Sequence, residues 1–164
     1  MNRLFLVCPT DFLESKIDEV NYNSNNYFYT SLGNSLNTDF KTLLHIKEIL
    51  NKHSIDEVHF VLSSSNKIIL DALKGQRFSR IRNMGNYYKK INQLKAHKIC
   101  KTQDETEYLS ISFYLNKKVK EVQQFLNISS STPIKVTGLI YDGKRAEFEN
   151  IYPVLYGLEY FQLN

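Results

Sequence analysis

Short apolar runs that alternate with helix-patterned segments constrain the fold of this 164-residue chain more than any other feature. The runs Arg3–Cys8, Tyr27–Ser31 and Glu57–Leu62 have the length and the aromatic or β-branched content of strands. Strands that alternate with helices in this rhythm form a parallel sheet with right-handed crossovers. The sequence therefore predicts an α/β fold.

The helices between these strands are indicated by apolar spacing and by capping residues. Asp11, with Glu14 three residues later, resembles an N-cap with its reciprocal acid, and we expect it to open the first helix. Leu32-Gly33-Asn34 predicts a turn after the second strand. The expected helices span residues 11–20, 39–53 and, after Ser63–Asn66, to about residue 73.

The second half of the chain predicts one long helix and a hairpin. Helical apolar spacing begins near Glu105 and is broken over Ser129–Pro133. Two strand-like runs, Ile134–Tyr141 and Ala146–Tyr152, then flank Asp142-Gly143-Lys144, which is a β-hairpin signal. A length of 164 residues suits a single domain, 1–164.

Composition limits the partners and the compartment. No apolar run approaches the roughly 20 residues that cross a bilayer, so no membrane span is expected. Two cysteines, Cys8 and Cys100, form neither a disulfide framework nor a paired zinc motif, and a reducing cytoplasm is the expected compartment. The net charge of +4 is unevenly distributed, because the segment 74–101 has nine Lys or Arg and no acidic residue.

The order of these elements and several strings resemble a β-carbonic anhydrase. Tyr27–Asn34 (YFYTSLGN) is similar to the family's strand that ends in Arg-Asn-Ala-Gly-Asn, with Gly33 and Asn34 kept. The strand EVHFVL matches the stretch before the family's His-x-x-Cys zinc motif, and residues 134–152 resemble its final hairpin. The resemblance covers most of the chain apart from a basic insertion at about 74–104. It implies a β-carbonic anhydrase-like parallel sheet flanked by helices, with a C-terminal β-hairpin.

The zinc ligands of that family are missing. Where the family has Cys-x-Asp-x-Arg, Cys8-Pro9-Thr10-Asp11 keeps the cysteine, lacks the arginine and has its acid displaced by one. Ser63–Asn66 occupies the place of His-x-x-Cys without a histidine or a cysteine. A catalytic zinc ion needs about three protein ligands and an open position. We therefore expect no zinc, no other cofactor and no carbonic anhydrase activity.

Polar residues follow the carboxyl ends of all three predicted strands, which is where open α/β sheets bind ligands. Because Ser63–Asn66 also opens a helix, its amides and hydroxyls are suited to bicarbonate, sulfate or phosphate, provided that Asp11 caps its own helix and faces away. N-caps without any ligand are the alternative interpretation. The candidate ligand-binding residues are Cys8, Thr10, Asp11, Ser31, Gly33, Asn34, Ser63, Ser64, Ser65 and Asn66.

Three functions stay open at this stage. The first is an inactive β-carbonic anhydrase-like protein that binds a small anion or a protein partner, including a second copy of itself. The second is an enzyme that uses Cys8 or Asp11 for different chemistry, although no base is evident beside Cys8. The third is nucleic-acid or polyanion binding through the basic segment, against which a solvated insertion is the simpler interpretation. Its candidate residues are Arg77, Arg80, Arg82, Lys89 and Lys90.

Overall fold

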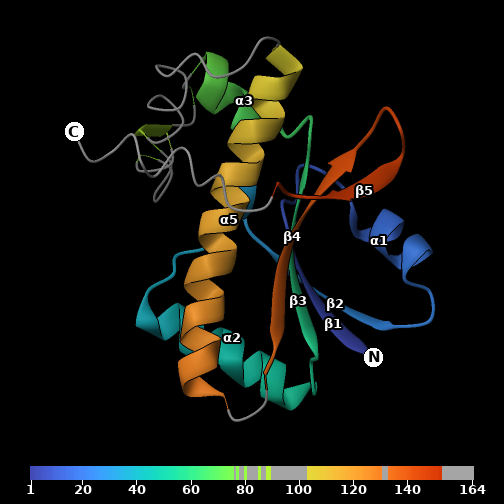
Figure 1. Cartoon of the computed structure of the whole chain (residues 1–164), viewed down its shortest axis with the longest axis vertical. Helices are drawn as coiled ribbons and strands as arrows, with labels where there is room; N and C mark the ends of the chain where they lie inside the picture. Colours follow the sequence, from blue (N-terminus) through green and yellow to red (C-terminus); the bar gives the residue numbers. More distant parts are fainter. Residues whose placement is uncertain are drawn as a thin grey trace.

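The computed structural model describes residues 1–75, 77, 80, 85, 88, 89, 103–130 and 133–152. Their strands form one five-stranded sheet in the order β2-β1-β3-β4-β5 (Figure 1). The first four strands run parallel, and β5 pairs antiparallel with β4. The predicted parallel sheet with a C-terminal hairpin is therefore confirmed. The strands are β1 (Asn2–Val7), β2 (Asn25–Thr30), β3 (Glu57–Ser63), β4 (Lys135–Asp142) and β5 (Glu147–Asn150).

Helices cover the two faces of the sheet unequally. The helices α2, α3 and α5 lie on one face, whereas α1 lies on the other (Figure 1). A short 3-10 helix, η1, follows β2 and carries the predicted turn. The helical elements are α1 (Glu14–Val20), η1 (Leu32–Asn34), α2 (Phe40–Lys52), α3 (Lys67–Lys74) and α5 (Gln103–Ser129).

Alternate residues of the central strands enter two hydrophobic clusters. Leu4 and Leu6 of β1 belong to the large cluster beneath α2, α3 and α5, whereas Phe5 and Val7 belong to the small cluster around Ile17 of α1. Each of these strand residues is almost fully buried. A strand buried on both faces is expected at the centre of a parallel sheet, which explains why the apolar run of β1 is continuous.

Most predicted boundaries lie close to the observed ones. The helix expected over residues 39–53 is α2, and Asp39 caps it, since its carboxylate accepts a hydrogen bond from the Thr42 amide at 2.8 Å. The first helix differs: it begins at Glu14, and its N-cap residue, Leu13, makes no side-chain cap. None of the helices in the described ranges is long and apolar enough to span a bilayer.

Three side chains of α5 hold the segment that follows β2. The Tyr114 hydroxyl donates to the Asn34 carbonyl at 2.7 Å, and Lys118 Nζ donates to the Leu36 carbonyl at 2.6 Å. Glu121 accepts a hydrogen bond from the Thr38 hydroxyl at 2.8 Å. Burial raises the pKa of Tyr114 and lowers that of Lys118. Helix α5 therefore fixes the loop that carries Gly33 and Asn34.

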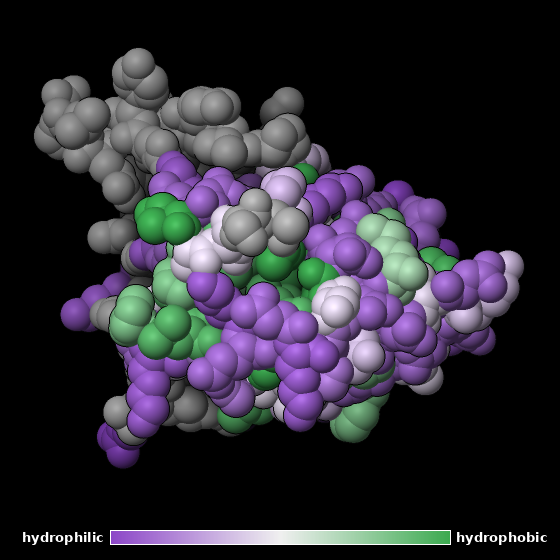
Figure 2. All heavy atoms as spheres, turned by 90° about the horizontal axis from the view of Figure 1, so that it is seen from below, coloured by the Kyte–Doolittle hydropathy of each residue, from purple (hydrophilic) through white to green (hydrophobic). Residues whose placement is uncertain are grey.

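Large apolar side chains are exposed at the end of the molecule formed by α2 and the C-terminal end of α5. Phe40 is 70% exposed and Ile128 is 89% exposed, and Leu44 is also accessible. Figure 2, which views this end, shows hydrophobic groups surrounded by hydrophilic residues. These side chains are not buried in the core and are available for contact with another molecule.

Candidate functional site

The loops after β1 and β2 meet at the Cys8 side chain. Cys8 is fully buried, and its Sγ atom accepts a hydrogen bond from the Gly33 amide at 3.0 Å. The same sulfur lies 3.1 Å from the Thr10 hydroxyl. Gly33 has a φ of 57°, a left-handed conformation that glycine adopts without strain. The turn predicted at Leu32–Asn34 thus presents an amide to the cysteine.

Asp11 points toward β3, so its predicted role as the cap of its own helix is wrong. Its carboxylate accepts hydrogen bonds from the Ser63 amide at 2.8 Å and from Asn66 Nδ2 at 2.7 Å. The backbone explains the difference. The Asp11 amide donates to the Cys8 carbonyl in a tight turn, and Phe12 then has a φ of 53°. This reversal delays the helix and directs Asp11 away from it.

Asn66 links Asp11 to the start of α3. Its Oδ1 atom accepts hydrogen bonds from the Ile68 and Ile69 amides, each at 3.0 Å, while Nδ2 donates to Asp11. Asn66 is fully buried and therefore has all of these groups out of water. The first amides of α3, which the sequence offered to an anion, are thus used inside the protein.

The serines before Asn66 also use their amides internally. The Ser64 amide donates to the Tyr141 carbonyl at 2.9 Å, and the Ser65 amide donates to Ser63 Oγ at 3.1 Å. The hydroxyls of Ser63 and Ser65 lie 2.9 Å apart. The Ser63–Asn66 loop therefore lies against Asp11, but the backbone amides of this loop already have partners.

Asn34 bonds to β3 two residues before the point where Asp11 does. Its Nδ2 atom donates to the Val61 carbonyl at 2.9 Å, whereas its Oδ1 atom is buried and has no hydrogen-bond partner among the described residues. The same holds, within that part of the chain, for the buried hydroxyl of Ser31 at the start of the turn. The backbone groups of alternate strand residues point the same way, so the Val61 carbonyl and the Ser63 amide face the same side. Asn34 and Asp11 therefore bond to the same side of β3, at positions two residues apart.

The environment of Asp11 disfavours its charge. The pKa of Asp11 is raised to about 6, chiefly by burial and to a smaller extent by nearby Glu14. The hydrogen bonds from Ser63 and Asn66 stabilise the carboxylate and partly oppose this effect. Asp11 is consequently a carboxyl group that changes charge near neutral pH.

The side chains at this edge do not fit a catalytic zinc ion. Among the described residues, no group of three or more His, Cys, Asp or Glu could hold a metal. Cys8 is the single thiol here, and the facing loop offers Ser63 and Asn66, which are not the nitrogen and sulfur ligands of zinc. Asp11 contacts both of those residues.

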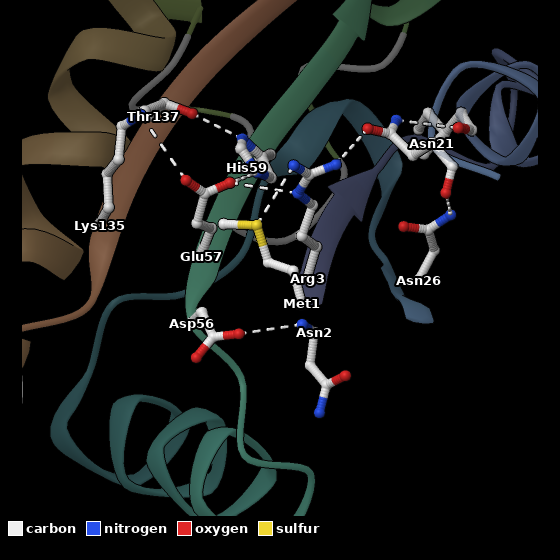
Figure 3. A network of polar contacts seen from close by, with 11 residues as sticks. Met1, Asn2, Arg3, Asn21, Asn26, Asp56, Glu57, His59, Lys135 and Thr137 are labelled. Atoms are coloured by element: carbon white, nitrogen blue, oxygen red, sulfur yellow. Dashed lines mark hydrogen bonds and ion pairs between the residues drawn. The ribbon is translucent and has the colours of Figure 1, made fainter. Parts of the chain in front are cut away.

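A second polar cluster lies on β1, β3 and β4, on the sheet face that carries α1 (Figure 3). Glu57 lies 3.2 Å from Arg3 Nε, 3.2 Å from His59 Nε2 and 3.7 Å from Lys135 Nζ. His59 also contacts the Thr137 hydroxyl at 2.7 Å. Burial lowers the pKa of His59, and Glu57 partly offsets this. Since each charged group has a neighbour of opposite sign, we interpret the cluster as a structural network of ion pairs across neighbouring strands.

Three of the five candidate polyanion-binding residues lie in the part of the chain that the structure describes. Arg77, Arg80 and Lys89 are exposed, whereas Arg82 and Lys90 lie outside the described residues. The sequence analysis did not find Tyr114 or Lys118 as residues that position the site. The apolar spacing after Glu105 indicated only that this stretch forms a helix. No local signal links Tyr114 or Lys118 to Asn34 and Leu36.

Comparison with known proteins identifies the fold. No family model matches the chain, and no curated protein matches it.

Solved structures of β-carbonic anhydrases do match the chain. CafA of Aspergillus fumigatus has a TM-score of 0.71 at 13% identity, covering 96% of this chain and 79% of that one. A structure from a study of two tetrameric enzymes of Sordaria macrospora has a TM-score of 0.69 at 10% identity, with coverages of 92% and 80%. The Coccomyxa enzyme in complex with acetazolamide has a TM-score of 0.64 at 11% identity, with coverages of 91% and 71%. This chain therefore has the fold of the β-carbonic anhydrases.

Proposed function

We propose that this chain is a non-catalytic β-carbonic anhydrase-like protein that functions without zinc by binding a ligand or a protein partner. The observation that carries the proposal is the position of Asp11. Its carboxylate bonds to Ser63 and Asn66, the residues that stand where the resemblance places the family's metal-binding loop. A hydrogen-bonded carboxylate thus joins two loops that a metal ion would otherwise join.

The chemistry of zinc supports this proposal. Hydration of carbon dioxide at neutral pH requires a metal that lowers the pKa of bound water to about 7. Serine and asparagine side chains are not deprotonated ligands, so neither Ser63 nor Asn66 replaces a histidine or a cysteine thiolate. Cys8 alone would bind such an ion weakly, and its sulfur already accepts the Gly33 amide.

Metal analysis and a hydration assay test the proposal together. The chain, purified without chelator, should contain well under one zinc ion per molecule and should not hydrate carbon dioxide above background. An active β-carbonic anhydrase handled in parallel controls for metal loss. Stoichiometric zinc with measurable hydration would overturn the proposal.

Binding of a small anion is the second candidate for the same edge. It is supported by exposed Ser65 and Lys67 near the start of α3. An ionised Asp11 would repel the anion, so binding should strengthen as the pH falls through about 6 and Asp11 becomes protonated. Calorimetry with phosphate and sulfate on either side of that pH tests this. Absence of binding at millimolar concentration in acid would exclude it.

We propose that the protein partner is a second copy of this chain. The Sordaria macrospora relatives by fold are tetrameric, and the exposed Phe40 and Ile128 are side chains that an interface would bury. Light scattering coupled to size exclusion should give a mass of at least two chains. Ile128→Glu should lower that mass if the end with α2 and α5 forms the interface, and a strictly monomeric wild type would contradict self-association.

We also propose weak polyanion binding by the basic segment and a cytoplasmic location. Arg77, Arg80 and Lys89 are exposed and of one charge, as an electrostatic surface requires. Weak binding to RNA that falls steeply with salt would be expected. The free, buried thiol of Cys8 is compatible with a reducing compartment.

A further inference from the structure

The strand β2 lies at one edge of the sheet, and β1 is its single strand neighbour in the described part of the chain. At the start of β2, the Asn25 amide donates to the Met1 carbonyl at 3.2 Å. Just beyond its end, the Ser31 amide donates to the Val7 carbonyl at 3.0 Å. Since the backbone groups of alternate residues point the same way, every second residue between these two also bonds to β1. The residues whose N–H and C=O groups point away from β1 are Asn26, Phe28 and Thr30.

This outer row of backbone groups is open, although the strand itself is held in place. No hydrogen bond between described residues reaches the row. On one face of the sheet the Phe28 ring stacks on the Phe5 ring, with centroids 5.9 Å apart. On the other face the Tyr27 ring lies 4.5 Å from the His53 ring. An edge strand with open N–H and C=O groups is a template for another strand, and one that is already ordered loses little entropy on pairing.

The two edges of the sheet differ in how they are protected against pairing. The strand β5 is four residues long, and its hairpin carries ion pairs from Arg145 to Asp142 at 2.7 Å and to Glu147 at 3.2 Å. Short length and charged side chains are the usual means by which proteins prevent edge pairing. The strand β2 has six residues and contains neither a charged residue nor a proline. The β2 edge is therefore suited to a partner strand, whereas the β5 edge is not.

The side chains of β2 are complementary to those of a second β2 strand that runs antiparallel to it. A two-fold axis through Phe28 places this residue opposite Phe28 of the other copy. Tyr27 then lies opposite Tyr29, and Asn26 opposite Thr30. Each outward-pointing residue thus meets another, and each such pair exchanges two hydrogen bonds. Aromatic pairs form on both faces, and no like charges meet because β2 has none.

We propose that two copies of this chain pair antiparallel through β2, which would join their five-stranded sheets into one continuous sheet. A second copy is the occupant because the open backbone groups and the side chains of β2 are complementary to themselves. The inference rests on the proposed self-association and adds a surface distinct from the end that carries Phe40 and Ile128. A molecular mass alone does not distinguish the two surfaces, so the test follows the backbone amides of β2.

Amide hydrogen exchange of the wild-type chain tests the pairing without a substitution. Above the dissociation constant of the pair, the amides of Asn26, Phe28 and Thr30 should be protected. On dilution below it, they should exchange at least about tenfold faster. The amides of Tyr27 and Tyr29, which bond to β1, should change much less and serve as the internal control.

A proline at position 30 tests the same groups by removing one outward N–H and leaving the bonds to β1 in place. Thr30→Pro should raise the dissociation constant at least about tenfold, measured by light scattering over a dilution series. Thr30→Val is the matched control, since it keeps the N–H and replaces the hydroxyl of an exposed side chain by a methyl group. Both changes are made in Ile128→Glu, so that the other surface does not contribute, and circular dichroism checks the fold.

The outcomes separate this pairing from the proposed self-association. A mass of two or more chains with outer β2 amides that exchange freely at every concentration would overturn the pairing and leave self-association standing. A strictly monomeric wild type would contradict both. Outer amides that stay protected in the dilute monomer would show that another part of this chain covers the edge. Equal dissociation constants for Thr30→Pro and Thr30→Val would likewise overturn the pairing.

Discussion

Replacing Asp11 should change how the stability of the fold depends on pH. The folded protein raises the pKa of Asp11 from 3.8 to about 6, chiefly because the carboxylate is removed from water. The folded state therefore holds the Asp11 proton more tightly than the unfolded state does. By linkage, the stabilisation from the protonated group is fully present below about pH 3.8 and is lost as the pH rises through about 6.

The size of the effect follows from that change in pKa. One pKa unit corresponds to about 1.4 kcal/mol, so a rise of about two units gives close to 3 kcal/mol. Asp11 is partly accessible, and screening by water reduces this to about 2 kcal/mol. The free energy of unfolding of the wild type should fall by that amount between acid and neutral pH, before the other groups are considered.

Urea unfolding of the wild type, Asp11→Asn and Asp11→Ala at a series of pH values isolates the effect. Asp11→Ala loses the hydrogen bonds from Ser63 and Asn66, whereas Asp11→Asn keeps one acceptor oxygen, so the absolute stabilities of the two variants will differ. Neither can ionise at position 11, so both should lack the fall of about 2 kcal/mol relative to the wild type. Wild-type and variant curves that stay parallel across the range would refute the argument.

Two further predictions concern the residues around Asp11 and the cross-strand network. Asn66→Ala removes the cap of α3 and one donor to Asp11, and should lower the free energy of unfolding by about 3 kcal/mol. Ser64→Ala is the matched control, since the cap of α3 is made by Asn66 and not by the Ser64 hydroxyl. Equal losses of stability in chemical denaturation would contradict this prediction. In an NMR titration, His59 should titrate below its usual 6.5, and Glu57→Gln should lower its pKa further because that carboxylate favours the charged imidazole. An unchanged His59 titration would show that burial alone sets its pKa.

Local patterns were sufficient for most of the fold. The strand β1 was predictable because Leu4–Val7 is a continuous apolar run, as a strand buried on both faces requires, and Phe60–Leu62 gives the same signal in the second half of β3. The cap of α2 was predictable because Asp39 and its partner, the Thr42 amide, are three residues apart. In each case the physical cause lies within a few residues of the element that it determines.

The role of Asp11 was not predictable in this way. Its spacing to Glu14 is that of a capping box, yet its partners are 52 and 55 residues further along the chain. Only the parallel pairing of β1 with β3 brings Ser63 within reach. The left-handed backbone of Phe12 was hidden as well, because phenylalanine gives no signal for a positive φ. Long-range contacts therefore overrode a valid local preference.

The same reversal of Asp11 changes which ligands this edge favours. From the sequence, the start of α3 offered unpaired amides, which suit an anion. In the structure, Asn66 Oδ1 accepts from the Ile68 and Ile69 amides, and the Asp11 carboxylate accepts from the Ser63 amide, so these donors are no longer open to an anion. An anion at this edge would be repelled by ionised Asp11, so its binding depends on the protonated form. Sulfate, whose own charge is constant over this range, should therefore bind better below about pH 6 than above it. In Asp11→Asn, this dependence should vanish, since no charge at position 11 is left to titrate.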